Sequence, residues 1–83
     1  MSFVMNVLTL KRKFERKNVN PSCYYFDHDV ISEGYFLIRA DLGWDVFYQE
    51  RGERTAWRWF ALENEACEYL HYLIFSDANY SEG

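Results

Sequence analysis

The first part of the chain carries apolar side chains at the spacing of an α-helix. A period near 3.6 residues places four of them on a single face, namely Phe3, Val7, Leu10 and Phe14. Lysines and arginines follow over residues 11–17, where cations complement the negative end of a helix dipole. Pro21 lies just beyond, and a proline cannot continue a helix. The pattern predicts an amphipathic helix over residues 2–17.

The middle of the chain changes to short aromatic and β-branched runs separated by turn residues, which is typical of an antiparallel meander. Two links, at residues 41–43 and 51–53, are three residues long and contain a glycine that can adopt positive φ. The strands on either side of each link should therefore be hairpin neighbours. A longer link covers residues 27–34. The four predicted strands are residues 23–26, 35–40, 44–50 and 55–60.

Helical periodicity returns after Phe60 and predicts a second helix over residues 62–76, with an acidic, flexible tail at 77–83. The resulting order, α-β-β-β-β-α, predicts an α+β fold. We expect a two-layer sandwich in which a four-stranded antiparallel meander has one helix before it and one after it, within a single domain over residues 1–76. Alternation along the strands gives two sets of side chains, and the sheet should bury one of them. One set includes Phe36, Ile38, Trp44, Val46 and Tyr48, and the other includes the side chains on the opposite face.

The composition points to one thin core and leaves two interpretations of the aromatic residues open. They make up 20% of the 83 residues, and aromatic side chains are enriched at protein interfaces, so some of them could form a binding surface. The alternative is that all of them belong to the core or to half-exposed strand positions. No segment has the run of about 18 apolar residues that a membrane span requires, and residues 1–10 do not resemble a signal peptide. We therefore expect a cytoplasmic protein without a membrane partner.

Candidate groups for catalysis are Cys23, Cys67, His28 and His71, and none of them belongs to a recognisable motif. Both cysteines are expected to be reduced, packed thiols, and His71 is expected to be structural because apolar residues flank it. The spacing of cysteines and histidines matches no metal site, and no glycine-rich phosphate loop is present. The sequence predicts a protein that is not an enzyme, with no catalytic residue, metal or cofactor.

Charge is distributed unevenly along the chain. Residues 1–19 have a net charge of +4, whereas residues 20–83 have a net charge of −8, which gives −4 for the whole chain. The basic run at residues 11–17 could contact a nucleic-acid backbone, but the solvated end of a helix also explains it. A small nucleic-acid-associated regulator is therefore an alternative, although the overall acidity makes nucleic acid an unlikely partner.

An acidic body with clustered aromatic residues suits a basic protein partner, because opposite potentials speed encounter and aromatic anchors supply affinity. In the strand over residues 55–60, Trp57 and Trp59 must face the opposite side from Arg58, and either side could be exposed. The oligomeric state stays open. The residues predicted to bind the partner are Asp45, Glu50, Arg51, Glu53, Trp57, Arg58 and Trp59.

Two stretches of the chain resemble a known family. They read Gly-Trp-Asp-Val-Phe-Tyr-Gln-Glu-Arg-Gly at residues 43–52 and, after Phe60, Glu-Asn-Glu-Ala-Cys-Glu-Tyr at residues 63–69. They are similar to small immunity proteins of bacterial polymorphic toxin systems, and the nearest type is immunity protein family 59. The likeness covers residues 23–73. It implies a cytoplasmic antitoxin that binds and neutralises a cognate toxin domain without catalysis, with a nuclease as the first candidate toxin.

Overall fold

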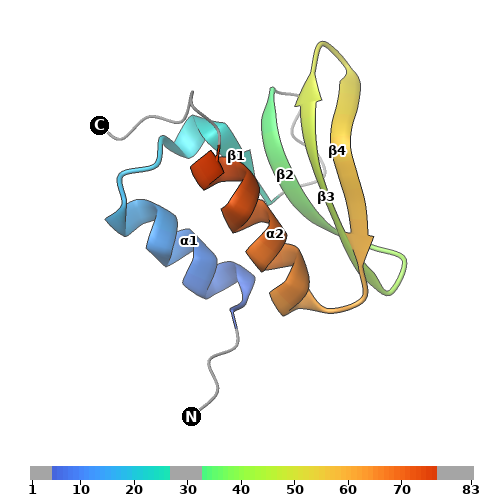
Figure 1. Cartoon of the computed structure of the whole chain (residues 1–83), viewed down its shortest axis with the longest axis horizontal. Coiled ribbons are helices and arrows are strands. Elements are labelled where there is room, and N and C mark those ends of the chain that lie inside the picture. Colours follow the sequence, from blue (N-terminus) through green and yellow to red (C-terminus); the bar gives the residue numbers. More distant parts are fainter. Residues whose placement is uncertain (1–4, 27–32, 77–83) are drawn as a thin grey trace.

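The computed structural model describes residues 5–26 and 33–76, and within them the chain follows the predicted order α-β-β-β-β-α (Figure 1). Residues 2–4 of the first predicted helix and the predicted tail at 77–83 lie outside the described residues. The elements in chain order are helix α1 (Val7–Arg16), the 3-10 turn η1 (Pro21–Cys23), strands β1 (Tyr24–Tyr25), β2 (Gly34–Ala40), β3 (Gly43–Glu50) and β4 (Glu53–Phe60), and helix α2 (Glu63–Ser76).

Helix α1 has defined caps at both ends. Asn6 and Thr9 form a capping box, because the Asn6 side chain accepts from the Thr9 backbone N–H at 2.9 Å and the Thr9 hydroxyl accepts from the Asn6 N–H at 2.9 Å. At the other end Asn18 adopts a left-handed conformation, with φ of 58°. The Val19 N–H then donates to the Phe14 carbonyl at 3.0 Å, which is a Schellman arrangement. These polar groups set where the helix begins and ends. The predicted helix over residues 2–17 started too early, because Asn6 caps the helix and residues 5 and 6 are not helical.

The sheet has the strand order β1-β2-β3-β4, but it is not antiparallel throughout. Strands β2, β3 and β4 form the predicted antiparallel meander. The prediction was wrong for β1, which has only two residues and runs parallel to β2, with Tyr24 opposite Tyr35. A parallel pair needs a return connection rather than a tight turn.

The two hairpin turns each contain two residues rather than the three predicted. Ala40 pairs directly with Gly43, and the residues between them have positive φ, 47° at Asp41 and 64° at Leu42. This is the geometry of a type I′ turn, whose twist matches that of the strands it joins. Glu50 pairs with Glu53 in the same way across Arg51 and Gly52, and the predicted positive φ of Gly52 is confirmed at 79°.

The shorter first turn changes which side chains share a face of the sheet. Phe36 lies opposite Phe47, and Leu37 lies opposite Val46. Neither predicted set of buried side chains is therefore correct, because Phe36 and Ile38 face the opposite side of the sheet from Val46. Removing one residue from a link shifts the pairing by one residue, and strand side chains alternate between faces.

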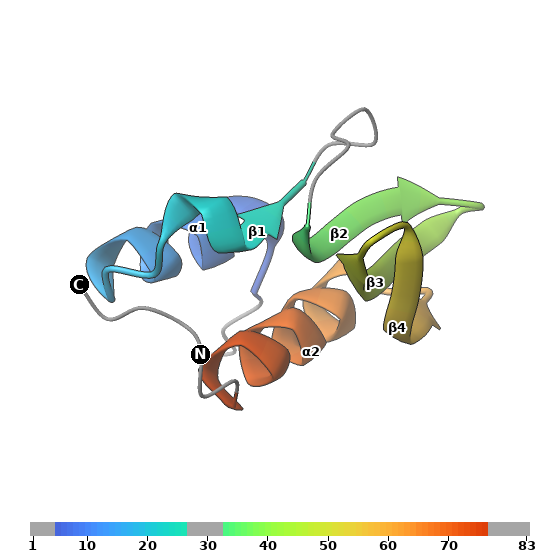
Figure 2. The same cartoon turned by 90° about the horizontal axis from the view of Figure 1, so that it is seen from above.

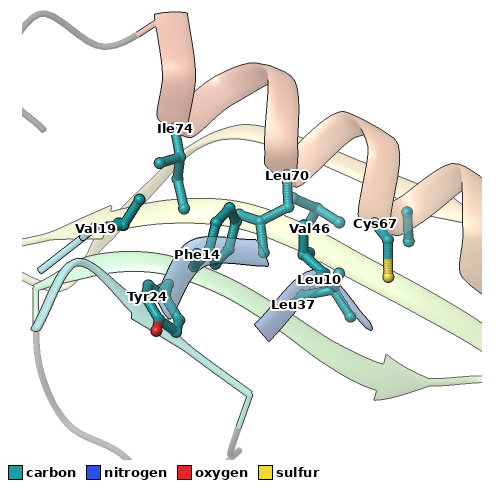
Figure 3. Close-up of a cluster of buried hydrophobic side chains, with 10 residues drawn as sticks. Leu10, Phe14, Val19, Tyr24, Leu37, Val46, Cys67, Leu70 and Ile74 are labelled. Atoms are coloured by element: carbon teal, nitrogen blue, oxygen red, sulfur yellow. The ribbon is translucent and has the colours of Figure 1, made fainter. Parts of the chain in front are cut away.

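One face of the sheet packs on the helices. Helix α2 lies across it, and α1 lies beside α2 towards the β1 edge (Figures 1 and 2). The Glu63 carboxylate at the start of α2 accepts from the Val7 N–H at 2.9 Å, so a negative charge sits at the positive end of α1. The buried cluster between these layers contains Leu10, Phe14, Val19, Tyr24, Leu37, Val46, Ala66, Cys67, Leu70 and Ile74 (Figure 3).

Gly43 is the position where the hairpin between β2 and β3 tolerates no side chain. A Cβ atom there would collide with the Phe60 carbonyl oxygen and with the Trp59 ring. We expect Gly43→Ala to lower the free energy of unfolding by about 1–3 kcal/mol, because backbone and a packed ring would both have to move. Urea denaturation measures the change.

Gly52→Ala is the matched control, because nothing lies within 4 Å of its Cβ and only the positive φ is unfavourable. It should cost about 1 kcal/mol. A Gly43→Ala protein as stable as the wild type would contradict the close approach of Trp59 to β3.

Candidate protein-binding face

The face of the sheet opposite α2 carries one aromatic side chain from each strand. These residues, Tyr25, Phe36, Phe47 and Trp57, are the aromatic row. Neighbouring ring centroids along the row lie 5.0 Å, 5.1 Å and 6.1 Å apart. Phe36 and Phe47 are buried, with 2% and 1% of their surface exposed, whereas Trp57 is 54% exposed. The row is therefore a packed second cluster that ends in an accessible tryptophan on β4.

A β-bulge in β4 decides which way the tryptophans point. Tyr48 pairs with Thr55, but Val46 pairs with Arg58, so β4 has one extra residue opposite Phe47. Ala56 lies at this irregularity with φ of 54°. Without the extra residue, continued pairing from Thr55 would turn Trp57 towards α2. The bulge instead brings Trp57 and Trp59 to the open face.

Helix α2 supports the bulge from the other side of the sheet. The Tyr69 hydroxyl donates to the Ala56 carbonyl at 3.0 Å. The bulge interrupts the regular ladder at this point, so the hydrogen bond gives that carbonyl a partner. The Tyr69 ring also packs on Phe60 at 5.4 Å. The orientation of the tryptophans is thus tied to the packing of α2.

Trp59 is held against the sheet by two contacts. Its indole N–H donates to the Ala40 carbonyl at 3.0 Å, and its ring passes directly over Gly43. The side chain is still 49% exposed. Because Gly43 lies beneath the inner face of the ring, the accessible part is the outer face. Asp45 lies directly opposite Trp59 in the ladder.

The other predicted binding residues lie elsewhere. Arg58 faces the α2 side, where its guanidinium lies 5.2 Å from both the Phe60 and Tyr69 ring centroids. The sequence left open whether the tryptophans or Arg58 lie on the exposed side of the sheet. In the structure the tryptophans lie on the helix-free face, and Arg58 does not. Glu50, Arg51 and Glu53 lie at the tip of the β3–β4 hairpin and line a shallow hollow of about 260 Å³.

The predicted set is therefore divided into three groups. Asp45, Trp57 and Trp59 share the open face, the hairpin tip forms a second group, and Arg58 is separate. Sequence analysis also missed Arg54, whose guanidinium lies 4.2 Å from the Phe47 ring centroid and 5.3 Å from that of Trp57. Simple alternation places Arg54 on the face of Arg58, and only the bulge brings it to the tryptophans.

Two of the candidates for catalysis, Cys67 and His71, are packed against other parts of the fold. Burial, with the nearby Glu63 and Glu68 carboxylates, raises the pKa of the Cys67 thiol to about 12, so the thiol stays protonated. Burial and the Lys13 charge lower the pKa of His71, whose ring lies 4.6 Å from that of Phe75. The uncharged form of the imidazole is therefore favoured, and the ring packs on Phe75 of the same helix. His28 lies outside the described residues.

No group of three or more metal-ligating side chains occurs in residues 5–26 and 33–76. No helix within these residues is long and apolar enough to cross a membrane.

The basic end of α1 borders a separate hollow. Its volume is about 280 Å³, and the residues that line it are Met5, Thr9, Arg12, Lys13 and Arg16. Three of the five cations in the basic run thus face one depression, while the other two, Lys11 and Lys17, do not line it. If the alternative function, nucleic-acid binding, is correct, this hollow is the place where the phosphates would lie.

Comparison of the chain with family models, with curated proteins and with solved structures gives no match.

The bulge makes a prediction about stability. The left-handed backbone conformation has a steric penalty for Ala56, because alanine has a Cβ atom, whereas glycine adopts that conformation without this penalty. We expect Ala56→Gly to change the free energy of unfolding by no more than about 1 kcal/mol, in the stabilising direction. Thermal and urea denaturation measure it.

Thr55→Gly is the matched control, because Thr55 is in regular pairing with Tyr48 and loses β propensity when replaced. It should destabilise the protein. Equal destabilisation by both substitutions would show that Ala56 is not in the left-handed region.

Proposed function

We propose that this chain is an immunity protein that binds a cognate bacterial toxin domain through the helix-free face of its sheet and thereby neutralises it. The observation that carries the proposal is the pair of half-exposed tryptophans, Trp57 and Trp59, held on one face by the β4 bulge. Exposed tryptophans on a rigid scaffold are typical anchors of protein interfaces. The resemblance of residues 43–52 and 63–69 to immunity proteins supports the same function.

The surroundings of the tryptophans fit an anchor role. Trp57 packs edge-on against buried Phe47 and beneath Arg54, while Trp59 is fixed by its hydrogen bond to Ala40. Both rings are thus partly immobilised before any partner arrives, which lowers the entropy lost on binding. Half of each side chain is still available for burial against another protein.

Electrostatics favours a basic partner. Residues 20–83, which include the whole sheet, have a net charge of −8, and acidic side chains lie both on the open face and at the β3–β4 hairpin tip. An acidic binding protein is steered towards a positively charged surface, such as the substrate groove of a nuclease. The proposed mode of inhibition is occlusion of that surface without any covalent chemistry.

The test begins with the genes next to the one that encodes this chain, where the proposal predicts a toxin domain. Its expression should arrest bacterial growth, and co-expression of this protein should restore growth. Trp57→Ser should abolish protection and weaken binding by about thirtyfold or more, because truncation of a central tryptophan costs about 2 kcal/mol or more. Isothermal titration calorimetry gives the affinity.

Tyr72→Ser is the matched control, because Tyr72 is an equally exposed aromatic residue, at 63%, on α2 rather than on the sheet. It should protect cells as the wild type does. Both variants must melt cooperatively at the wild-type temperature. Loss of protection in Tyr72→Ser, with full protection in Trp57→Ser, would move the binding surface to the helices.

A second candidate function rests on the hollow beside α1. Arg12, Lys13 and Arg16 converge there, and such a cluster could hold the phosphates of a nucleic acid. Under this alternative the protein is a small nucleic-acid-associated regulator. The proposal predicts instead that the protein has no significant affinity for nucleic acid at physiological salt.

Fluorescence anisotropy with labelled DNA and RNA at increasing salt distinguishes the two functions, because phosphate contacts weaken steeply as salt rises. Arg12→Gln with Arg16→Gln should leave protection from the toxin unchanged. Submicromolar nucleic-acid binding that this pair of substitutions removes would favour the regulator.

A further inference from the structure

We propose that Trp59 and Asp45 form a subsite for an arginine side chain on the basic surface of a protein partner. The inference rests on the proposed function, because it names the chemical group that the open face recognises. In the complex, the partner's guanidinium would lie flat on the outer face of the Trp59 indole and would pair with the Asp45 carboxylate.

The Trp59 ring has the geometry of a stacking platform. Its inner face lies on Gly43, its N–H is satisfied by the Ala40 carbonyl, and 49% of the side chain is accessible. The hydrogen bond and the close contact hold the ring against the sheet at Ala40 and Gly43. Only a group that approaches the outer face can therefore add contacts, and a flat group adds the most.

The other two tryptophans already have an arginine. The Arg39 guanidinium lies 5.0 Å from the Trp44 ring centroid, and that of Arg54 lies 5.3 Å from that of Trp57. Trp44 and Trp57 thus each have an arginine of this chain over the ring. Among the described residues, no cation lies over Trp59, so the corresponding position over its ring is free.

Asp45 supplies the charge. It lies directly opposite Trp59 across the β3–β4 ladder, with Ile38 opposite it on β2, so the carboxylate rises between an apolar side chain and the indole. It is half-buried, and no described side chain forms an ion pair or hydrogen bond with it. A carboxylate beside apolar surface attracts a cation more strongly than one in open water.

Arginine fits this arrangement better than the alternatives. Its planar guanidinium can stack on the indole and direct two N–H groups at the carboxylate at the same time. The ammonium of lysine is a compact, strongly hydrated charge that cannot stack. A nucleotide could stack its base on Trp59, but its phosphates would be repelled by Asp45 and by the acidic body of the protein.

The test uses peptides, so it needs no toxin. The probe is an acetylated, amidated fourfold Arg-Gly repeat, and the neutral control peptide has citrulline in place of arginine. NMR follows the three indole N–H signals, which are assigned with Trp44→Phe, Trp57→Phe and Trp59→Phe. We expect the arginine peptide to shift the Trp59 signal in a saturable manner, and the citrulline peptide to have no such effect.

Two protein variants localise the charge. Asp45→Asn should weaken peptide binding about threefold or more, since it removes the ion pair beside the ring. Glu68→Gln is the matched control, because it removes an exposed carboxylate from α2, on the other side of the sheet. Its affinity for the peptide should equal that of the wild type.

Several outcomes would overturn the subsite. These are an unchanged Trp59 signal, equal binding by Asp45→Asn and wild type, equal shifts from the lysine analogue of the peptide, or stronger shifts from an oligothymidine. Trp59 shifts that depend on protein concentration alone would assign the face to a second copy of this chain. A failed peptide titration with intact toxin protection would reject only the subsite, whereas the reverse result would reject only the immunity function.

Discussion

The register of β2, β3 and β4 is the constraint on which the rest of the structure depends. Two local features set it, the two-residue turn at Asp41 and Leu42 and the bulge at Ala56. The turn places Leu37 and Val46 against the helices and Phe36 and Phe47 on the other side. Halfway along β4, the bulge then reverses which alternate residues point towards the helices. Because side chains alternate between faces, one residue more or less in either place would exchange core and surface.

The two faces of the sheet are linked through β4. On the helix side, Arg58 lies over the rings of Phe60 and Tyr69, and the Tyr69 hydroxyl reaches the Ala56 carbonyl. On the open side, the same stretch of β4 presents its two tryptophans. Packing of α2 therefore stabilises the strand geometry that the proposed binding face requires, although α2 itself lies on the opposite side of the sheet (Figure 2).

The open face combines rigidity with accessibility. Buried Phe36 and Phe47 form its floor, and the tryptophans on β4 keep about half of their surface exposed. Arg54 and Asp45 add one charge of each sign at different points of the face. Such a mixture suits recognition of a protein surface, where a few aromatic anchors provide affinity and charges provide orientation. The basic hollow beside α1 belongs to a different part of the molecule.

The sequence alone determined the order of the elements, because helical and strand periodicities are local properties and residues 18–21 mark the end of α1. It did not give the start of α1, because the Asn6 cap lies inside the predicted helix. The sequence also identified Trp57, Trp59 and Asp45 as binding candidates. Tertiary structure decided the parallel pairing of β1, the length of the first turn and the bulge at Ala56, since each depends on how distant strands pair. Leu42 and Ala56 carry no sequence signal for positive φ, which most side chains avoid, so the sequence did not reveal where the turn and the bulge lie.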